Sequence, residues 1–155
     1  MKPRITAALV VLLTLGLCGS ASFAAQGGSG PPAPAKKKLD RSGQQRVGKA
    51  SFYARRFAGR KMANGRPMNL RHNNAASKTL PLGTTARVTN LDTGRSAVVT
   101  IQDRGPYVPG RIVDLSPATA QEIGLTPEAG VATVAVAPIA VPLPDGSVKP
   151  GDGAR

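Results

Sequence analysis

Apolar and polar residues alternate along several short segments in the middle of the chain. In residues 49–55 every second side chain is apolar, with Phe52 on the apolar face and Tyr53 directed to the other side. The same alternation recurs at residues 84–91 and 131–136, and residues 97–101 form an apolar run within a further segment, 96–102. A period of two is typical of a β-strand with one buried face. We therefore predict a strand in each segment, with Phe52 in the core.

Turn and helix signals separate these segments. Asp92, Thr93 and Gly94 are typical of a tight hairpin connection. Ser116 and the proline after it are N-cap and first-turn residues, which predict a short helix over residues 117–123. Six short strands with one or two short helices in so few residues indicate a mainly-β domain. A closed barrel is favoured because it leaves no exposed strand edge.

The segment IQDRGPYVPGRIVDLS, residues 101–116, places two carboxylates at the ends of two predicted strands. Asp103 ends the first, because the Arg-Gly-Pro that follows cannot continue a strand in register. Asp114 follows the second, Ile112 and Val113. Strand ends and their loops commonly present functional groups to solvent. We interpret Asp103 as the candidate for chemistry and Asp114 as a residue that hydrogen-bonds backbone amides near the helix start, the alternative being that Asp114 is a second carboxylate beside Asp103.

A long excursion, residues 57–74, has neither a helical nor a strand period and is rich in Gly, Asn, Arg and Met. Loops of this length in small domains are usually functional or disordered. The only histidine, His72, lies here. We interpret it as a surface residue, the alternative being that it reaches a substrate groove.

The beginning of the chain has the pattern of an export signal. Two basic residues precede an apolar run, Ile5 to Leu17, which is too short to span a bilayer as a helix, and small residues follow up to Ala24. We predict a signal peptide over residues 1–24 and an exported, periplasmic protein. Cys18 is the only cysteine. A lipid anchor on Cys18 is the less favoured alternative, because the bulky Leu17 precedes it.

The rest of the chain divides by composition. Residues 25–46 are rich in Gly, Pro and Lys and have almost nothing to bury, which predicts a disordered basic linker. Residues 47–138 hold the predicted barrel. Residues 139–155 are rich in Pro, Gly and charge and predict a flexible tail.

The charge favours an anionic partner. The chain has a formal net charge of +13, and removal of Lys2 and Arg4 leaves a value near +11. Nucleic acid is excluded, because an exported chain rarely meets it and no segment resembles a basic reading helix. A cell-wall polymer with peptide carboxylates fits better, with an anionic membrane surface as the alternative. We expect a monomer.

Composition also narrows the candidate chemistry. Trp is absent and aromatic residues make up 3% of the chain, so a carbohydrate would be held mainly by hydrogen bonds, with Tyr53 or Tyr107 as the aromatic contact. One histidine without a carboxylate cluster cannot make an ordinary zinc site, so we expect neither a metal nor a cofactor.

Three blocks, SKTLPLGTTARVTNL, DRGPY and GRIVDLS, give the chain a family resemblance. In order and spacing they resemble the rare lipoprotein A family, over about residues 48–137. The resemblance implies a six-stranded double-psi β-barrel and lytic transglycosylase activity on peptidoglycan glycan strands. It also implies that the excursion forms one wall of the substrate groove.

The resemblance further implies roles for individual residues. Asp103 would be the general acid and base, and the glycan would be held by Tyr53, Asn64, Arg66, Ser77 and Arg104. Two positions depart from the family pattern: Arg66 stands where relatives have a glutamate, and Ser77 where they have a histidine. The alternative function is therefore a non-catalytic, expansin-like module that binds peptidoglycan without cleaving it.

Overall fold

The computed structural model describes residues 38–155. The predicted signal peptide, Cys18 and most of the predicted linker lie outside the described residues. Over residues 38–155 the structure has no helix that is both long enough and apolar enough to cross a membrane.

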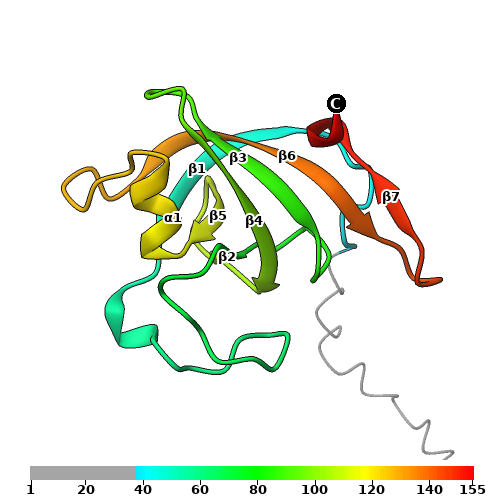
Figure 1. The fold of residues 1–155 in the computed structure, drawn as a ribbon, viewed down its shortest axis with the longest axis horizontal. Helices are drawn as coiled ribbons and strands as arrows, with labels where there is room; N and C mark the ends of the chain where they lie inside the picture. The colour runs from blue at the N-terminus through cyan, green and yellow to red at the C-terminus, as the bar shows by residue number, and fades with distance from the viewer. Residues whose placement is uncertain (1–37) are drawn as a thin grey trace, which may run out of the picture. The chain divides into compact units, whose positions relative to one another are not determined.

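Seven strands, one α-helix and two single-turn 3-10 helices (η) make up the described chain (Figure 1). In chain order they are β1 (Arg46–Phe52), η1 (Arg55–Phe57), β2 (Asn74–Ala76), β3 (Thr85–Asn90), β4 (Ser96–Asp103), β5 (Arg111–Leu115), α1 (Pro117–Glu122), β6 (Ala132–Pro142), β7 (Val148–Pro150) and η2 (Asp152–Ala154). The mainly-β prediction is confirmed.

Six of the strands close into a barrel. The strand order is β1-β5-β2-β4-β3-β6-β7, and a further pairing of β1 with β6 completes the ring. β1 with β5 and β2 with β4 are parallel, whereas the other pairs are antiparallel. This mixed, closed sheet confirms the predicted six-stranded double-psi barrel, and β7 is an addition at its edge.

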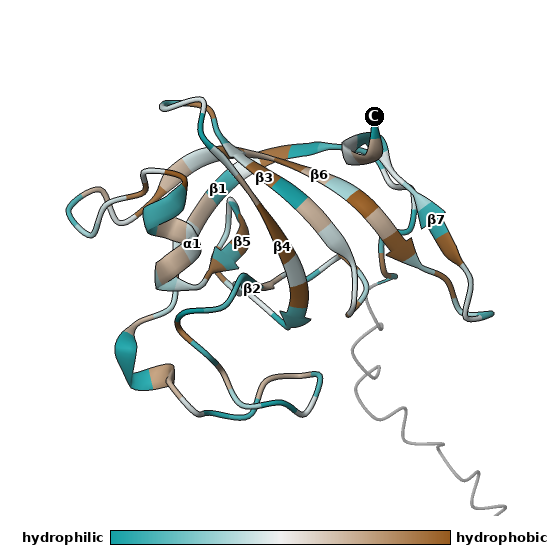
Figure 2. Ribbon diagram, viewed as in Figure 1, coloured by the Kyte–Doolittle hydropathy of each residue, from teal (hydrophilic) through white to brown (hydrophobic). Residues whose placement is uncertain are grey.

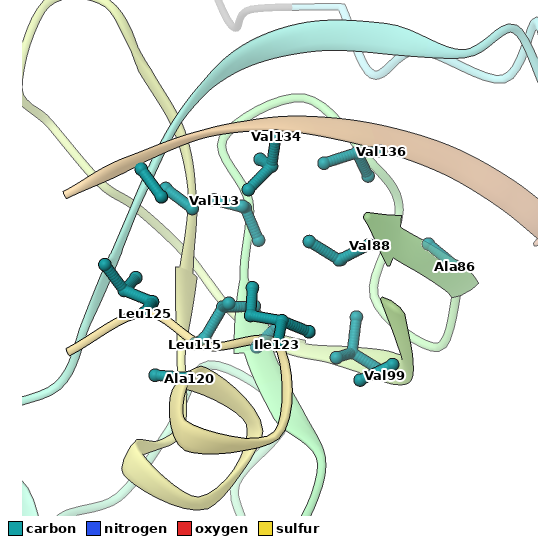
Figure 3. Packing of buried hydrophobic residues seen from close by; sticks show 14 of the residues in the cluster. Ala86, Val88, Val99, Val113, Leu115, Ala120, Ile123, Leu125, Val134 and Val136 are labelled. Atoms are coloured by element: carbon teal, nitrogen blue, oxygen red, sulfur yellow. The ribbon is translucent and has the colours of Figure 1, made fainter. Parts of the chain in front are cut away.

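Apolar side chains from all sides of the ring fill its interior (Figure 3). Ile101 of β4, Leu115 of β5 and Ile123, just after α1, are completely buried. Phe52 packs against this core, as its place in the alternation predicts. In Figure 2 hydrophobic colouring follows the barrel strands, whereas the loop between η1 and β2 is mostly hydrophilic.

The predicted helix is present with its predicted cap. The Ser116 hydroxyl accepts a hydrogen bond from the backbone N–H of Thr119, and Pro117 is the first helical residue. Gly124 follows with a φ of +76°, a conformation that L side chains rarely adopt. The short helix thereby places Ile123 in the core.

The C-terminal segment differs from the predicted flexible tail. β6 continues to Pro142 and forms a hairpin with β7, and η2 follows. The prolines of this segment do not favour a strand. Pro138, however, lies opposite the register shift between Thr85 and Ala86, and an irregularity of this kind tolerates a residue without an N–H donor. The segment packs closely, since a Cβ on Gly153 would lie 2.4 Å from the Ala137 carbonyl oxygen.

The last residues of the predicted linker also contact the barrel. The Asp40 backbone N–H donates to the Thr79 carbonyl at 2.8 Å, and the Asp40 carboxylate pairs with Arg46 at 2.8 Å. The Gln45 N–H donates to the Asp152 carboxylate at 2.8 Å, which joins this segment to the C-terminal one. The ordered fold therefore begins before residue 47.

Candidate functional site

Asp103 is the last residue of β4 and its carboxylate is held from three sides. Oδ2 accepts a hydrogen bond of 2.9 Å from the Tyr53 hydroxyl. Oδ1 accepts hydrogen bonds from the backbone N–H groups of Ala63, at 2.9 Å, and Arg104, at 2.8 Å. The predicted strand end is confirmed, and the donors come from residues 50 and 40 positions away in the sequence as well as from its neighbour.

The excursion reaches Asp103 because a small turn fastens it to the end of β4. Lys61 and Pro67 form an isolated bridge, and the N–H of Gly65, whose φ is +85°, closes the turn on Met62. The Asn64 N–H donates to the Gln102 carbonyl at 3.0 Å. These bonds place the Ala63 N–H against Asp103.

A cavity of about 410 Å³ opens beside Asp103. Its lining combines two aromatic rings, two cations and two thioethers with this one carboxylate: Tyr53, Phe57, Arg60, Lys61, Met62, Met68 and Asp103. The rings of Tyr53 and Phe57 meet edge to face, with centroids 5.8 Å apart. Two guanidiniums lie over Phe57, that of Arg56 at 5.2 Å and that of Arg60 at 5.8 Å from the ring centroid.

The surroundings of Tyr53 keep its hydroxyl protonated. Burial raises the pKa of Tyr53 far above its ordinary value of 10.0, and the negative charge and hydrogen bond of Asp103 raise it further. The phenol therefore keeps its proton at neutral pH and can donate it in a hydrogen bond to the ionised carboxylate of Asp103.

Ser77 and Arg104 were both predicted to hold the glycan, but their polar groups point to the backbone. Ser77 is 2% exposed, and its hydroxyl accepts hydrogen bonds from the N–H groups of Thr79 and Leu80. Arg104 Nη1 donates to the carbonyl oxygens of Ser77 and Leu80. Neither residue lines the cavity beside Asp103, so both shape the loop behind it.

Asn64 and Arg66 lie on the exposed turn of the excursion. The Asn64 side chain accepts a hydrogen bond from the Arg66 N–H at 3.0 Å, which supports the turn. Arg66 lines a second cavity, of about 670 Å³, together with Arg71 and His72. The two cavities share Met62 and Met68 in their lining, so they lie side by side along the excursion.

Asp114 differs from its interpretation as a partner of backbone amides. Its carboxylate accepts hydrogen bonds from the Ser51 hydroxyl and from Arg111 Nη2, the latter at 3.0 Å. Parallel pairing of β1 with β5 sets Ser51 opposite Asp114, which explains the contact. Asp114 does not line the cavity beside Asp103.

Sequence reasoning missed Phe57, Arg60 and Lys61 as lining residues. The signal available was the spacing in YARRFAGRK, residues 53–61, where an aromatic residue recurs after four positions amid four cations. The segment was assigned to a loop of no period, and the grouping of rings and cations depends on the 3-10 turn η1, which has no strong sequence signature. Within residues 38–155 no three His, Cys, Asp or Glu side chains are grouped so that they could hold a metal ion.

Comparison with known proteins places these residues in a family. The family model described as lytic transglycolase, a double-psi β-barrel, matches residues 45–136. An endolytic peptidoglycan transglycosylase RlpA of Pasteurella multocida is 55% identical over 84 residues, which are 54% of this chain and 29% of that protein. The protein of the same name from Vibrio cholerae is 45% identical over 97 residues, 63% of this chain and 36% of that protein.

The chain thus spans about a third of the length of these relatives. Among solved structures, the Streptomyces papain inhibitor aligns with a TM-score of 0.50 and 22% identity, over 63% of this chain and 96% of that one, a likeness of fold. Because the family model covers more than half of the chain and the closed mixed barrel agrees with it, the chain belongs to the lytic transglycolase family of double-psi β-barrel proteins, the RlpA family.

Proposed function

We propose that this chain is a lytic transglycosylase that cleaves the glycan strands of peptidoglycan, with Asp103 as general acid and base. The observation that carries the proposal is the position of Asp103, the single carboxylate lining a cavity with two aromatic rings. Relatives named endolytic peptidoglycan transglycosylases support it over the barrel domain.

The hydrogen bonds around Asp103 distinguish its two oxygens. Oδ1 meets two backbone N–H groups, which can donate but not accept. Oδ2 meets the Tyr53 hydroxyl, which can rotate and accept as well as donate. A transferable proton on Asp103 is therefore accommodated at Oδ2.

The reaction needs one proton donor that later accepts a proton. Asp103 gives its proton to the leaving glycosidic oxygen as the bond from that oxygen to the anomeric carbon breaks. The 6-hydroxyl of the same sugar attacks the anomeric carbon, forms the 1,6-anhydro bond and returns its proton to Asp103. No water is consumed, so a single carboxyl group suffices, unlike glycoside hydrolysis, which uses two.

In this proposal the other predicted site residues orient Asp103, bind the glycan or position a loop. Tyr53 orients Asp103 through its hydroxyl and lines the cavity in which the sugar would lie. Arg66 extends the binding surface into the neighbouring cavity, supported by Asn64. Ser77 and Arg104 act as positioning residues, because their hydrogen bonds fix the loop that follows β2.

One observation favours a second candidate, a non-catalytic module that binds peptidoglycan. Arg66 and Ser77 replace the acid and the histidine expected from the family pattern, and the Ser77 hydroxyl is buried among backbone N–H groups. It cannot relay a proton to substrate from that position. Such a module would bind peptidoglycan through the same cavity and through the positive charge of the excursion, without cleaving it.

The place of action is part of the proposal. The predicted signal peptide, residues 1–24, and relatives named for peptidoglycan support export to the periplasm. We expect the protein to act there as a monomer. The bulky Leu17 before Cys18 disfavours a lipid anchor. An anionic membrane surface remains the alternative partner for the basic charge.

Digestion of purified sacculi separates the two functions. We expect 1,6-anhydro-muropeptides by mass spectrometry with the native protein, and a fall of about 10²–10⁴-fold in their rate with Asp103→Asn, the usual loss for a general acid. Asp92→Asn, in the exposed hairpin turn, is the matched control. Binding of sacculi without any anhydro product would establish the non-catalytic module instead.

A further inference from the structure

A third cavity, of about 580 Å³, lies beside α1, and we call it the α1 cavity. Its lining comes from residues 52–55 at the end of β1, from α1 and residues 124–128 after it, and from Arg95 in the turn between β3 and β4. In Figure 1 η1 and α1 lie on the same side of the barrel. Tyr53 lines both the α1 cavity and the cavity beside Asp103, so the two cavities adjoin at this residue.

Hydrogen bonds hold the walls of the α1 cavity together. The Ile123 carbonyl, at the end of α1, accepts from the Asn90 side-chain amide at 3.0 Å and from the Thr93 hydroxyl at 2.8 Å. These two bonds connect the turn between β3 and β4 to the helix. The Leu125 N–H donates to the Ala120 carbonyl at 2.8 Å and holds the chain after the helix against it. The cavity is therefore formed before a ligand enters, as is usual for small-molecule sites.

The lining of the α1 cavity suits a sugar ring. Phe52, Leu125 and Pro127 provide apolar surface, whereas Gln121 and Arg95 have exposed polar side chains. A sugar has the same division, with C–H groups on its face and hydroxyl or amide groups along its edge. The Arg95 guanidinium donates hydrogen bonds, and the Gln121 amide both donates and accepts them. Together these two side chains match the hydroxyl and N-acetyl groups of an amino sugar.

The charge of the α1 cavity is nearly balanced. Arg55 and Arg95 are the cations of its lining, and Glu128 is the carboxylate. Over residues 38–155 neither of the two salt bridges involves these three side chains. A carboxylate in the lining disfavours an anionic polymer or membrane surface, because like charges repel. Of the two sugars that alternate in peptidoglycan, the uncharged N-acetylglucosamine therefore fits better than N-acetylmuramic acid, which carries a lactyl carboxyl group.

We propose that the α1 cavity is a further sugar subsite, which holds an N-acetylglucosamine residue of the same glycan strand whose bond is cleaved at Asp103. The inference rests on the proposed function, because it requires a glycan at Asp103. The cavity lined by Arg66 adjoins the catalytic cavity along the excursion, and the α1 cavity adjoins it at Tyr53. A sugar in the α1 cavity contacts Tyr53, the residue that donates a hydrogen bond to Asp103. Long strands should therefore be cleaved faster than short ones.

The test follows the cleavage of glycan oligomers of increasing length. Peptide-free oligomers of N-acetylglucosamine and N-acetylmuramic acid are incubated with the native protein, Gln121→Ala and Arg95→Gln, and kcat/KM is measured from the anhydro products. Glu122→Ala, at the next exposed residue of α1, and Arg87→Gln, at an exposed position of β3, are matched controls outside the lining. Thermal melting establishes that all variants are folded.

For the native protein we expect kcat/KM to rise with the length of the oligomer until the strand fills both cavities. The measured quantity is the ratio of kcat/KM for the longest oligomer to that for the shortest one cleaved. Gln121→Ala and Arg95→Gln should each lower this ratio about fivefold, the effect of one lost hydrogen bond. Glu122→Ala and Arg87→Gln should keep the native ratio.

Three results overturn the subsite. If both cavity variants keep the native ratio while product formation still depends on Asp103, the subsite is absent and the proposed function stands. If both variants slow the cleavage of all oligomers equally, the α1 cavity supports the shape of the catalytic site and binds no distant sugar. Absence of anhydro products from every oligomer and from purified sacculi removes the proposed function, and the subsite with it.

Discussion

The barrel and the excursion between β1 and β2 hold their shape by different means. The barrel is a closed ring of paired strands around completely buried side chains such as Ile101, Leu115 and Ile123. The excursion buries Met62 and Met68 and otherwise exposes its charges. Stability therefore comes from apolar packing in the barrel, whereas the excursion is free to carry cations that a core would not tolerate.

Only a few backbone hydrogen bonds connect the two regions. The turn at residues 61–67 donates two N–H groups to the end of β4, one to the Gln102 carbonyl and one to the Asp103 carboxylate. Asp103 is thus the candidate catalytic group, and its carboxylate also holds the loop that forms its cavity, through the hydrogen bond from Ala63. Changes in the excursion should alter function with little effect on folding, and changes in the buried core of the barrel should do the reverse.

The largest expected effect lies in the barrel. Ile101→Ala removes a side chain with 0% exposure from the centre of the core. We expect a loss of about 2–5 kcal/mol in the free energy of unfolding, from lost burial and the cavity left behind. Lys61→Ala, in the exposed turn, should stay within about 0.5 kcal/mol. Urea unfolding measures both free energies. Similar losses for the two variants would contradict the view that stability comes from the barrel core and not from the excursion.

Much of the barrel could be predicted because its signals are local. Alternation predicts the strand around Phe52, an apolar run predicts the strand around Ile101, and Ser116 with Pro117 predicts the helix start. β2 was not found as a strand, since Asn74–Ala76 is three fully buried residues with no period to detect. The C-terminal hairpin was missed because its prolines lower strand propensity, and only the tertiary partner of Pro138 shows why they are tolerated.

Substitution of Tyr53, the residue after β1, tests whether its hydroxyl contributes to catalysis. Tyr53→Phe keeps the ring and its edge contact with Phe57 but removes the hydrogen bond to Asp103. Hydrogen bonds to charged groups contribute about 1.5–3 kcal/mol, so we expect the rate of anhydro product formation to fall at least tenfold. Tyr107→Phe, at a side chain that is 78% exposed, should have no effect. Equal rates for both variants would remove Tyr53 from the site.

Prediction of the site was less complete than prediction of the fold. Asp103 could be placed, because a strand end followed by Arg-Gly-Pro is visible in the sequence. Its partners could not be placed, because Tyr53 and Ala63 reach it only through barrel closure and the turn at 61–67. Ser77 and Arg104 were assigned to substrate from their positions in a motif, whereas their contacts with backbone groups depend on loop geometry.

The packing of the C-terminal segment offers a smaller perturbation of the barrel. Gly153→Ala would place a Cβ 2.4 Å from the Ala137 carbonyl oxygen, and a backbone atom cannot move aside as a flexible side chain can. Overpacking of this kind typically costs about 1–3 kcal/mol, which we expect as a lower midpoint of urea unfolding. Ala154→Ser, at the exposed next residue, is the control. An unchanged midpoint would mean that η2 is not packed on β6.

The smallest expected effect concerns the ion pair that fastens residues 40–46 to the barrel. Burial alone would raise the pKa of Asp40, but hydrogen bonds from Ser42 and Arg46 outweigh it and hold the pKa below its ordinary value of 3.8. A carboxylate with a lowered pKa in the folded state stabilises the fold when the pH is above that ordinary value, and this contribution is lost as the pH falls through the folded-state pKa.

Because Arg46 is 58% exposed, solvent screens the pair, and Asp40→Asn should cost about 0.2–1 kcal/mol at pH 7. The difference between Asp40→Asn and the native protein in urea unfolding should shrink as the pH is lowered below 3.8. A difference that grows on acidification would show that another carboxylate controls the attachment of this segment to the barrel.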